Sequence, residues 1–140
     1  MEETLLVIED DSAIQHVLQL MLEAEGFRVK LARNGKSALE LLTSLKPALI
    51  LLDLGLPDIG GEVVVAELER RNLRPNVPLL ILTASYADPE DRQAIAARTG
   101  AESCVTKPFA ADFLLAEINR LLGRGNGKAS AQRPVPMGEG

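Results

Sequence analysis

The sequence predicts an α/β fold in which helices cover both faces of a doubly wound, five-stranded parallel sheet. The first observation is a set of short apolar runs bounded by turn residues, at residues 5–8, 27–32, 48–52, 78–82 and 104–106. The second is that the segments between these runs carry apolar residues at helical spacing. Strands that alternate with helices over short connections pair in parallel through right-handed crossovers. A chain of 140 residues is long enough for one such domain.

The third apolar run indicates how the sheet is covered. Residues 48–52 read Ala-Leu-Ile-Leu-Leu and contain no polar residue. A strand with one solvated face alternates apolar and polar residues, whereas a strand buried on both faces does not. This run therefore favours a parallel sheet with helices on both sides.

Helical periodicity is clearest in three segments. The first begins with a candidate capping box formed by Ser12 and Gln15, and its apolar face consists of Ile14, Val17, Leu18, Met21 and Leu22. The same spacing predicts a second helix through Ala38, Leu41, Leu42 and Leu45. It also predicts the fifth helix, through Leu114, Ile118 and Leu121.

The remaining two helices rest on weaker patterns. Residues 61–71 include three consecutive valines, which suit a strand, but the alternating order of elements favours a helix. The fourth helix is expected to open with Asp88 as its N-cap and Pro89 in its first turn. Its apolar residues are mostly alanine. Because its apolar face is the weakest of the five, we expect this helix to be the one that moves.

The composition limits the domain organisation and the classes of partner. We expect one domain over residues 1–122 and a disordered Gly- and Pro-containing tail or linker over residues 123–140. The net charge is −5 and no stretch is dominated by Lys and Arg, so direct nucleic-acid binding is not expected. Cys104 is the single cysteine, and the N-terminus is neither a signal peptide nor a membrane span. We therefore expect a cytoplasmic protein without a membrane partner.

Carboxylates follow the first and third predicted strands. The first strand runs into Glu9, Asp10 and Asp11, and the third ends at Asp53. The carboxyl ends of parallel strands meet at one edge of a sheet, so these like charges are expected to repel unless protons or a cation intervene. No His or Cys lies at these positions, which argues against zinc. The pattern favours Mg²⁺, which accepts carboxylates and water and leaves room for a phosphate oxygen.

A hydroxyl and an ammonium are expected at the same edge. The fourth strand ends at Thr83, and Lys107 follows the fifth. These groups suit the oxygens of a transferring phosphoryl group that do not contact the metal. The Asp53 carboxylate is then a candidate nucleophile that becomes an aspartyl phosphate, with Lys107 pairing with Asp53 at rest and with the phosphoryl group afterwards.

With these residues in place, the chain resembles the receiver domains of two-component response regulators over residues 3–122. The resemblance rests on several motifs in order along the chain: Leu5-Leu6-Val7-Ile8-Glu9-Asp10, Leu51-Leu52-Asp53-Leu54-Gly55-Leu56-Pro57, Gly61, Leu82-Thr83-Ala84 and Thr106-Lys107-Pro108-Phe109. It implies a flavodoxin-like strand order of 2-1-3-4-5. It also implies a histidine kinase or histidine phosphotransfer protein as the phosphoryl donor.

The resemblance further implies a role for each matched residue. It assigns the metal to Glu9, Asp10, Asp53 and the backbone carbonyl of Gly55. It makes Thr83 the switch hydroxyl and the Lys107–Pro108 peptide bond cis. Downstream, it implies a protein target or an output domain outside this chain, and it leaves a homodimer open.

The resemblance has one clear departure. Receiver domains usually carry Tyr or Phe three residues before the lysine, where this chain has Cys104. In the family that ring swings inward as the threonine moves, so its loss affects the coupling of Thr83 to the face formed by the fourth helix and the fifth strand and helix. Tyr86 is a candidate substitute for the ring. Gly55 and Ser85 are small, so we expect water to reach the phosphoryl group and the phosphorylated state to have an ordinary lifetime.

Three residues near these motifs have structural alternatives. Asp11 either contacts the metal through water or caps the first helix, and capping is favoured. His16 lies between core positions of that helix and is expected to face solvent or a partner. Cys104 is either a redox sensor or, as we favour, a small residue packed in an inner strand.

Other functions fit the sequence less well. A haloacid-dehalogenase-like phosphatase needs a second Asp where this chain has Gly55. A flavodoxin-like flavin carrier needs a phosphate-binding loop after the first strand, where Glu9 and Asp10 would repel phosphate. We therefore expect a signalling phosphoacceptor, which assists its own phosphoryl transfer and dephosphorylation, and not an enzyme. A receiver-like interaction domain that acts without phosphorylation is the alternative.

Overall fold

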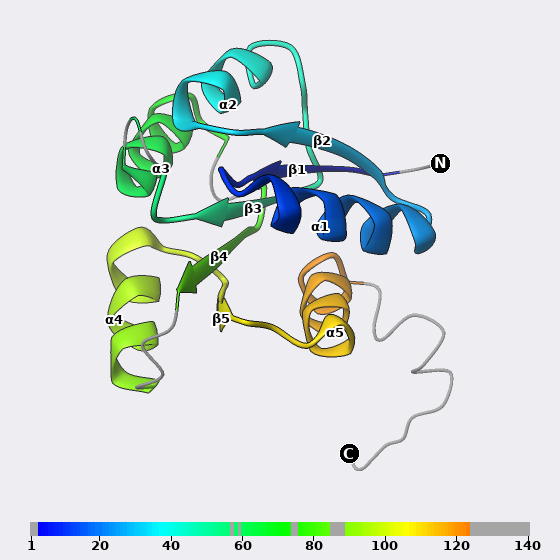
Figure 1. Ribbon diagram of the computed structural model, residues 1–140. Coiled ribbons are helices and arrows are strands. Elements are labelled where there is room, and N and C mark those ends of the chain that lie inside the picture. The colour runs from blue at the N-terminus through cyan, green and yellow to red at the C-terminus, as the bar shows by residue number, and fades with distance from the viewer. Residues whose placement is uncertain (1–2, 57, 59, 74–75, 85–88, 124–140) are drawn as a thin grey trace.

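A computed structural model describes residues 3–56, 58, 60–73, 76–84 and 89–123 of the chain (Figure 1). Five strands form one parallel sheet in the order β2-β1-β3-β4-β5, as the resemblance implied. The strands are β1 (Thr4–Ile8), β2 (Arg28–Ala32), β3 (Leu49–Asp53), β4 (Leu79–Ala84) and β5 (Ser103–Lys107). The helices are α1 (Ser12–Ala24), α2 (Gly35–Leu41), α3 (Gly61–Arg70), α4 (Pro89–Thr99) and α5 (Ala111–Leu121).

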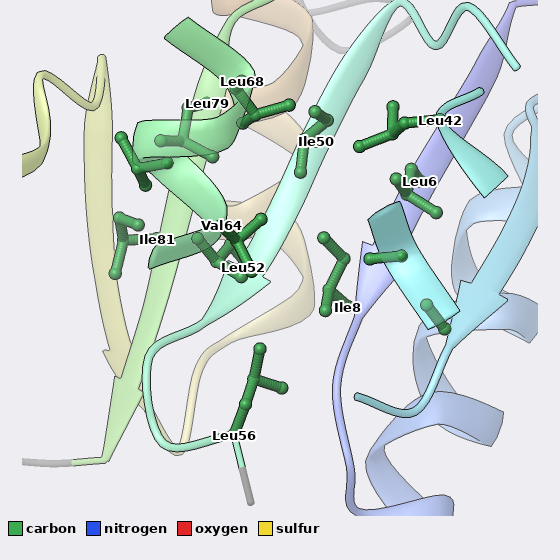
Figure 2. Packing of buried hydrophobic residues seen from close by; sticks show 13 residues of the cluster. Leu6, Ile8, Leu42, Ile50, Leu52, Leu56, Val64, Leu68, Leu79 and Ile81 are labelled. Atoms are coloured by element: carbon green, nitrogen blue, oxygen red, sulfur yellow. The ribbon is translucent and has the colours of Figure 1, made fainter. Parts of the chain in front are cut away.

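The helices form a layer on each face of the sheet (Figure 1). On one face, α1 and α5 pack through Leu18, Leu22, Leu114 and Ile118. The opposite face is covered by α2 and α3. Ala38 of α2 is buried there, as are Val64 and Leu68 of α3 (Figure 2). The doubly wound architecture predicted from the sequence is therefore confirmed.

The central strand β3 explains why the apolar run at residues 48–52 lacks alternation. Leu49 and Leu51 belong to the cluster under α1 and α5, whereas Ile50 and Leu52 belong to the cluster under α2 and α3. All four side chains are fully buried. Burial on both faces makes β3 the rigid element whose last residue is Asp53.

The start of α1 differs from the predicted capping box. Asp11 is the N-cap, and its Oδ1 accepts a hydrogen bond from the Ile14 backbone N–H at 3.0 Å. Ser12 is the first helical residue, so it does not cap. The Gln15 side chain instead donates to the Glu9 backbone carbonyl. The alternative capping role of Asp11 is confirmed, because its extended backbone lies one residue earlier than the box required.

The valine-rich segment is a helix, as the alternating order predicted. Val64 and Val65 are buried, while Val63 is 53% exposed. Helix α4 begins at Pro89, and the proposed cap Asp88 lies outside the described residues. Among the described side chains of α4, Ile95 packs against the core and Thr99 is buried. The predicted tail beyond residue 123 is likewise outside the described part of the chain.

Strand β5 lies at the edge of the sheet, which corrects the expectation for Cys104. Cys104 is half-buried in this edge strand and packs against the cluster under α2 and α3. It is therefore not in an inner strand, because among the described residues only β4 pairs with β5. Within the described residues, none of the helices is long and apolar enough to cross a membrane.

Candidate functional site

The strand order brings four polar residues to one edge of the sheet. Asp53 is the last residue of β3, and Glu9 follows β1 directly. Thr83 lies near the end of β4, and Lys107 ends β5. Because β1, β3, β4 and β5 are consecutive parallel neighbours, their carboxyl ends open on the same side of the domain. The predicted convergence of these residues is confirmed.

Three carboxylates form the centre of the site. One oxygen from each of Glu9, Asp10 and Asp53 lies within 4.8 Å of the other two. Glu9 is fully buried and Asp53 is 6% exposed, whereas Asp10 is open to solvent. The cluster is therefore accessible from the Asp10 side. Its mutual repulsion has to be offset by a positive charge.

Lys107 supplies a positive charge within the protein. Its Nζ lies 2.7 Å from Glu9 Oε1 and 3.5 Å from Asp53 Oδ2. The Lys107 side chain is only 16% exposed, so water screens these attractions weakly. The sequence led us to expect Lys107 on Asp53 at rest, but its closer partner is Glu9. The expectation missed Glu9 because the burial of that carboxylate is a tertiary property.

The pKa values of Glu9 and Lys107 are both raised above their usual values in water. Burial raises the pKa of the Glu9 carboxyl and the charge of Asp53 adds to the effect, while hydrogen bonds from Lys107 and the Asp11 backbone oppose it. Burial would lower the pKa of Lys107, but the hydrogen bond to Glu9 and the charges of both carboxylates outweigh it, so that pKa is raised. The lysine is thus held in its charged form, as a counter-ion to the carboxylates.

Backbone amides orient the two buried carboxylates. The Asp11 N–H donates to Glu9 Oε2 at 3.2 Å, and the Gly55 N–H donates to Asp53 Oδ1 at 2.9 Å. Gln15 adds its bond to the Glu9 carbonyl from the first turn of α1. The sequence analysis did not assign Gln15 this task, although its place after the acidic run was visible.

Thr83 and Gly55 both lie at the edge of the sheet that carries Asp53. In the register of the sheet, Asp53 is opposite Leu82 on β4, so Thr83 comes one residue further toward the open edge. Thr83 is half-buried, and Gly55 is exposed beside Asp53. The Lys107–Pro108 peptide bond is cis, as the resemblance implied. Ser85 and Tyr86, which carried the hydrolysis and ring-substitution hypotheses, lie outside the described residues.

The donor set fits a hard divalent cation. All three side chains of the cluster offer carboxylate oxygens. Glu9 Oε1 is buried, and the Lys107 Nζ lies 2.7 Å from it. An oxygen-only set with one solvent-facing member is suited to Mg²⁺, which keeps several water ligands. Asp11 is occupied by capping, and His16 is exposed on α1.

Comparison with protein families decides the identity of this domain. The family model described as "Response regulator receiver domain" matches residues 5–119. The chain belongs to the response regulator receiver domain family. The receiver domain accordingly has its carboxylate cluster at the carboxyl edge of the sheet, and the resemblance stated from the motifs is confirmed.

Named relatives of this receiver domain include two bacterial regulators. The phosphate regulon transcriptional regulatory protein PhoB of Pseudomonas aeruginosa is 31% identical over 136 residues, which cover 97% of this chain and 58% of that protein. The transcriptional regulatory protein AfsQ1 of Streptomyces coelicolor is 38% identical over 122 residues, 87% of this chain and 52% of that protein. The chain thus spans about half the length of the curated relatives it matches.

Solved structures agree with this assignment. A putative response regulator from Chloroflexus aurantiacus superposes on the receiver domain with a TM-score of 0.79 at 30% identity, covering 89% of this chain and all of that one. The BeF3-activated receiver domain of DrrB superposes with a TM-score of 0.76 at 29% identity, covering 89% of this chain and all of that one. Both comparisons support the receiver fold over the described elements.

Proposed function

We propose that this receiver domain is the phosphoacceptor of a two-component phosphorelay and is phosphorylated on Asp53. The donor we propose is a histidine kinase or a histidine phosphotransfer protein. The observation that carries the proposal is the convergence of Asp53 with Glu9, Asp10 and Lys107 at one accessible edge. A purely structural strand end does not require two buried carboxylates around a nearly buried lysine.

Each residue of the site has a separate role in the proposed phosphoryl transfer. An ionised oxygen of Asp53 forms a bond to phosphorus while the bond from phosphorus to the donor's nitrogen or oxygen breaks, and the donor keeps that electron pair. Lys107, with Nζ at 3.5 Å from Asp53 Oδ2, is placed to stabilise negative charge on the phosphoryl oxygens. Thr83 offers a hydroxyl from the neighbouring strand. The same groups would assist hydrolysis when water replaces the donor.

Glu9, Asp10, Asp53 and the backbone carbonyl of Gly55 are the residues that would hold Mg²⁺. When bound, the cation supplies positive charge that offsets the carboxylates and the incoming phosphoryl group. The task of the protein is to present these oxygens together, which the buried ends of β1 and β3 support.

The consequence of phosphorylation that we propose is a change in partner binding. The matched relatives carry about as much chain again beyond the shared region, and PhoB and AfsQ1 are named as transcriptional regulatory proteins. A downstream protein or an output domain is therefore the proposed target, with a second copy of the receiver as another partner. Contact with nucleic acid would then be made by the output partner and not by this acidic domain.

Phosphorylation by a small donor tests the proposal directly. The protein is incubated with acetyl phosphate, with and without Mg²⁺, and intact mass is measured for the wild type, Asp53→Ala and Asp112→Ala. Asp112 is an exposed carboxylate on α5 and is the matched control. We expect a Mg²⁺-dependent gain of one phosphoryl group in the wild type and in Asp112→Ala but not in Asp53→Ala. No adduct under any condition would overturn the proposal in favour of an interaction domain that acts without phosphorylation.

A further inference from the structure

Asp58 joins the segment after Asp53 to a helix that is distant in the sequence. Its Oδ1 accepts the Gly35 backbone N–H at 2.9 Å, and its Oδ2 accepts the Lys36 backbone N–H at 3.0 Å. These two amides are the first of α2. A carboxylate that receives two N–H groups at a helix N-terminus is held by charge-assisted hydrogen bonds. Asp58 is thus tied to α2 although it belongs to the connection between β3 and α3.

Helix α2 already has a cap of its own. Asn34 is its N-cap, and Asn34 Oδ1 accepts the Ser37 backbone N–H at 2.8 Å and the Ser37 hydroxyl at 2.7 Å. Asn34 therefore satisfies one orphan amide of α2 from within its own connection, as an ordinary cap does. The two bonds to Asp58 differ because they link the start of α2, after the β2–α2 connection, to the β3–α3 connection. They position the Asp58 segment as well as completing the helix.

The segment that contains Gly55 has other anchors. The Leu54 N–H donates to the Leu82 carbonyl at 3.3 Å. Leu56 is 9% exposed, and Figure 2 shows its side chain directed toward the core from beyond the end of β3. A Cβ on Gly61 would lie 2.7 Å from Leu54 Cδ2 and 3.0 Å from Leu54 Cα, so the start of α3 packs closely on Leu54. Gly55 itself is exposed and lies between Leu54 and Leu56.

Gly55 lies directly beside the carboxylate cluster of Glu9, Asp10 and Asp53. Its N–H holds Asp53 Oδ1 at 2.9 Å, and a Cβ at this position would lie 3.6 Å from the same oxygen. A displacement of the Gly55 backbone would therefore change the hydrogen bond that orients the Asp53 carboxylate. It also changes the direction of the carbonyl that would hold Mg²⁺. The N-terminus of α2 is a firm point for attachment, because Gly35 and Ala38 are buried against the sheet.

We propose that Asp58 is a positioning residue, whose bonds to α2 hold the Gly55 backbone in the geometry required for Mg²⁺ binding and phosphorylation of Asp53. This inference rests on the function proposed above and deepens it. Asp58 acts through Gly55 and does not contact the phosphoryl group. The bonds of Asp58 to α2 fix the chain three residues beyond Gly55, and the Gly55 N–H in turn orients Asp53 Oδ1.

Three variants separate positioning from helix stability. Asp58→Ala removes both bonds to α2, and Asp58→Asn keeps one acceptor oxygen without the charge. Asn34→Ala is the matched control, because it removes two hydrogen bonds at the same end of the same helix and leaves the Asp58 link intact. Asp58→Ala and Asn34→Ala are both expected to lose stability, since each removes hydrogen bonds at the N-terminus of α2.

Affinity for Mg²⁺ is measured by isothermal titration calorimetry on all four proteins. We expect Asp58→Ala to raise the dissociation constant for Mg²⁺ about fivefold to tenfold, the equivalent of one to two net hydrogen bonds. Asn34→Ala is expected to stay within about twofold of the wild type, and Asp58→Asn to fall between the other variants. Equal affinity in Asp58→Ala and Asn34→Ala would overturn the proposal. Should Asp58→Ala fail to fold, Asp58→Asn decides the comparison.

A second measurement needs neither the metal nor the phosphoryl group. Amide hydrogen exchange of Gly55 in the metal-free protein reports whether its bond to Asp53 persists. We expect faster exchange in Asp58→Ala than in Asn34→Ala, and unchanged exchange in Asp58→Ala would refute the positioning role. If the wild type binds no Mg²⁺ and forms no phosphoryl adduct, the proposed function is refuted. The Gly55 exchange rates still test the positioning role of Asp58 in that case.

Discussion

Replacing Lys107 with methionine should destabilise the metal-free protein strongly. Methionine keeps the length and apolar character of the side chain but removes the charge that lies 2.7 Å from Glu9 and 3.5 Å from Asp53. At an effective dielectric constant of about 20, the attractions at these distances are about 6 and about 5 kcal/mol before desolvation is subtracted. Removing one partner of a buried ion pair costs about 3 to 5 kcal/mol. We expect a loss near the lower limit, because the open Asp10 side admits water.

A loss of about 3 kcal/mol is large beside the total stability of roughly 5 to 15 kcal/mol that is usual for a domain. It is measured by urea unfolding at neutral pH in the presence of a chelator. The chain has no tryptophan, so circular dichroism is the suitable signal. Saturating Mg²⁺ should narrow the difference between wild type and Lys107→Met, since it supplies positive charge to the same carboxylates.

A double-mutant cycle with Glu9→Gln identifies the partner. If stability is lost because the buried Glu9 charge is left unpaired, Lys107→Met should lower the free energy of unfolding by at least about 1 kcal/mol less in the Glu9→Gln background. Part of the cost should persist there, because the contact to Asp53 remains. A Lys107→Met effect below about 0.5 kcal/mol, or an equal effect in both backgrounds, would refute the reasoning.

Three further predictions follow from other parts of the domain. Two arginine partners lower the pKa of Glu67 from 4.5 to about 2, so the stabilisation that Glu67 adds is present above pH 4.5 and is lost as the pH falls toward 2. The difference in urea midpoint between wild type and Glu67→Gln should therefore shrink over that range, and a constant difference would contradict the assignment. Asp11→Ala should lower the free energy of unfolding by about 1 kcal/mol through loss of the α1 cap, whereas Asp11→Asn, which can still cap, should lose much less; equal losses in both would argue against capping. Gly55→Gln should slow dephosphorylation relative to wild type, because its side chain begins 3.6 Å from Asp53 Oδ1 and obstructs water; faster loss of phosphate, followed by intact mass, would count against easy access of water.

Much of the fold and of the site follows from local patterns. The unbroken apolar run of β3 and the helical spacing in α1 predicted the layers on both faces, because burial on a given face dictates residue type at a fixed period. The convergence of Asp53 with Lys107 followed from the rule that parallel strands open their carboxyl ends at one edge. Errors concerned single residues, such as the capping box expected from Ser12 and Gln15 at the start of α1, where Asp11 is the cap.

By itself, the sequence determined the parallel sheet, the helices on its two faces and which polar residues meet at its edge, since these depend on periodicity and on strand direction. Tertiary structure decided that Lys107 lies closer to Glu9 than to Asp53, and that Asp58 binds the first amides of α2. Such contacts join residues far apart along the chain. They depend on distances of a few ångströms and on burial, which are set only when the layers pack together and which no local spacing of residue types encodes.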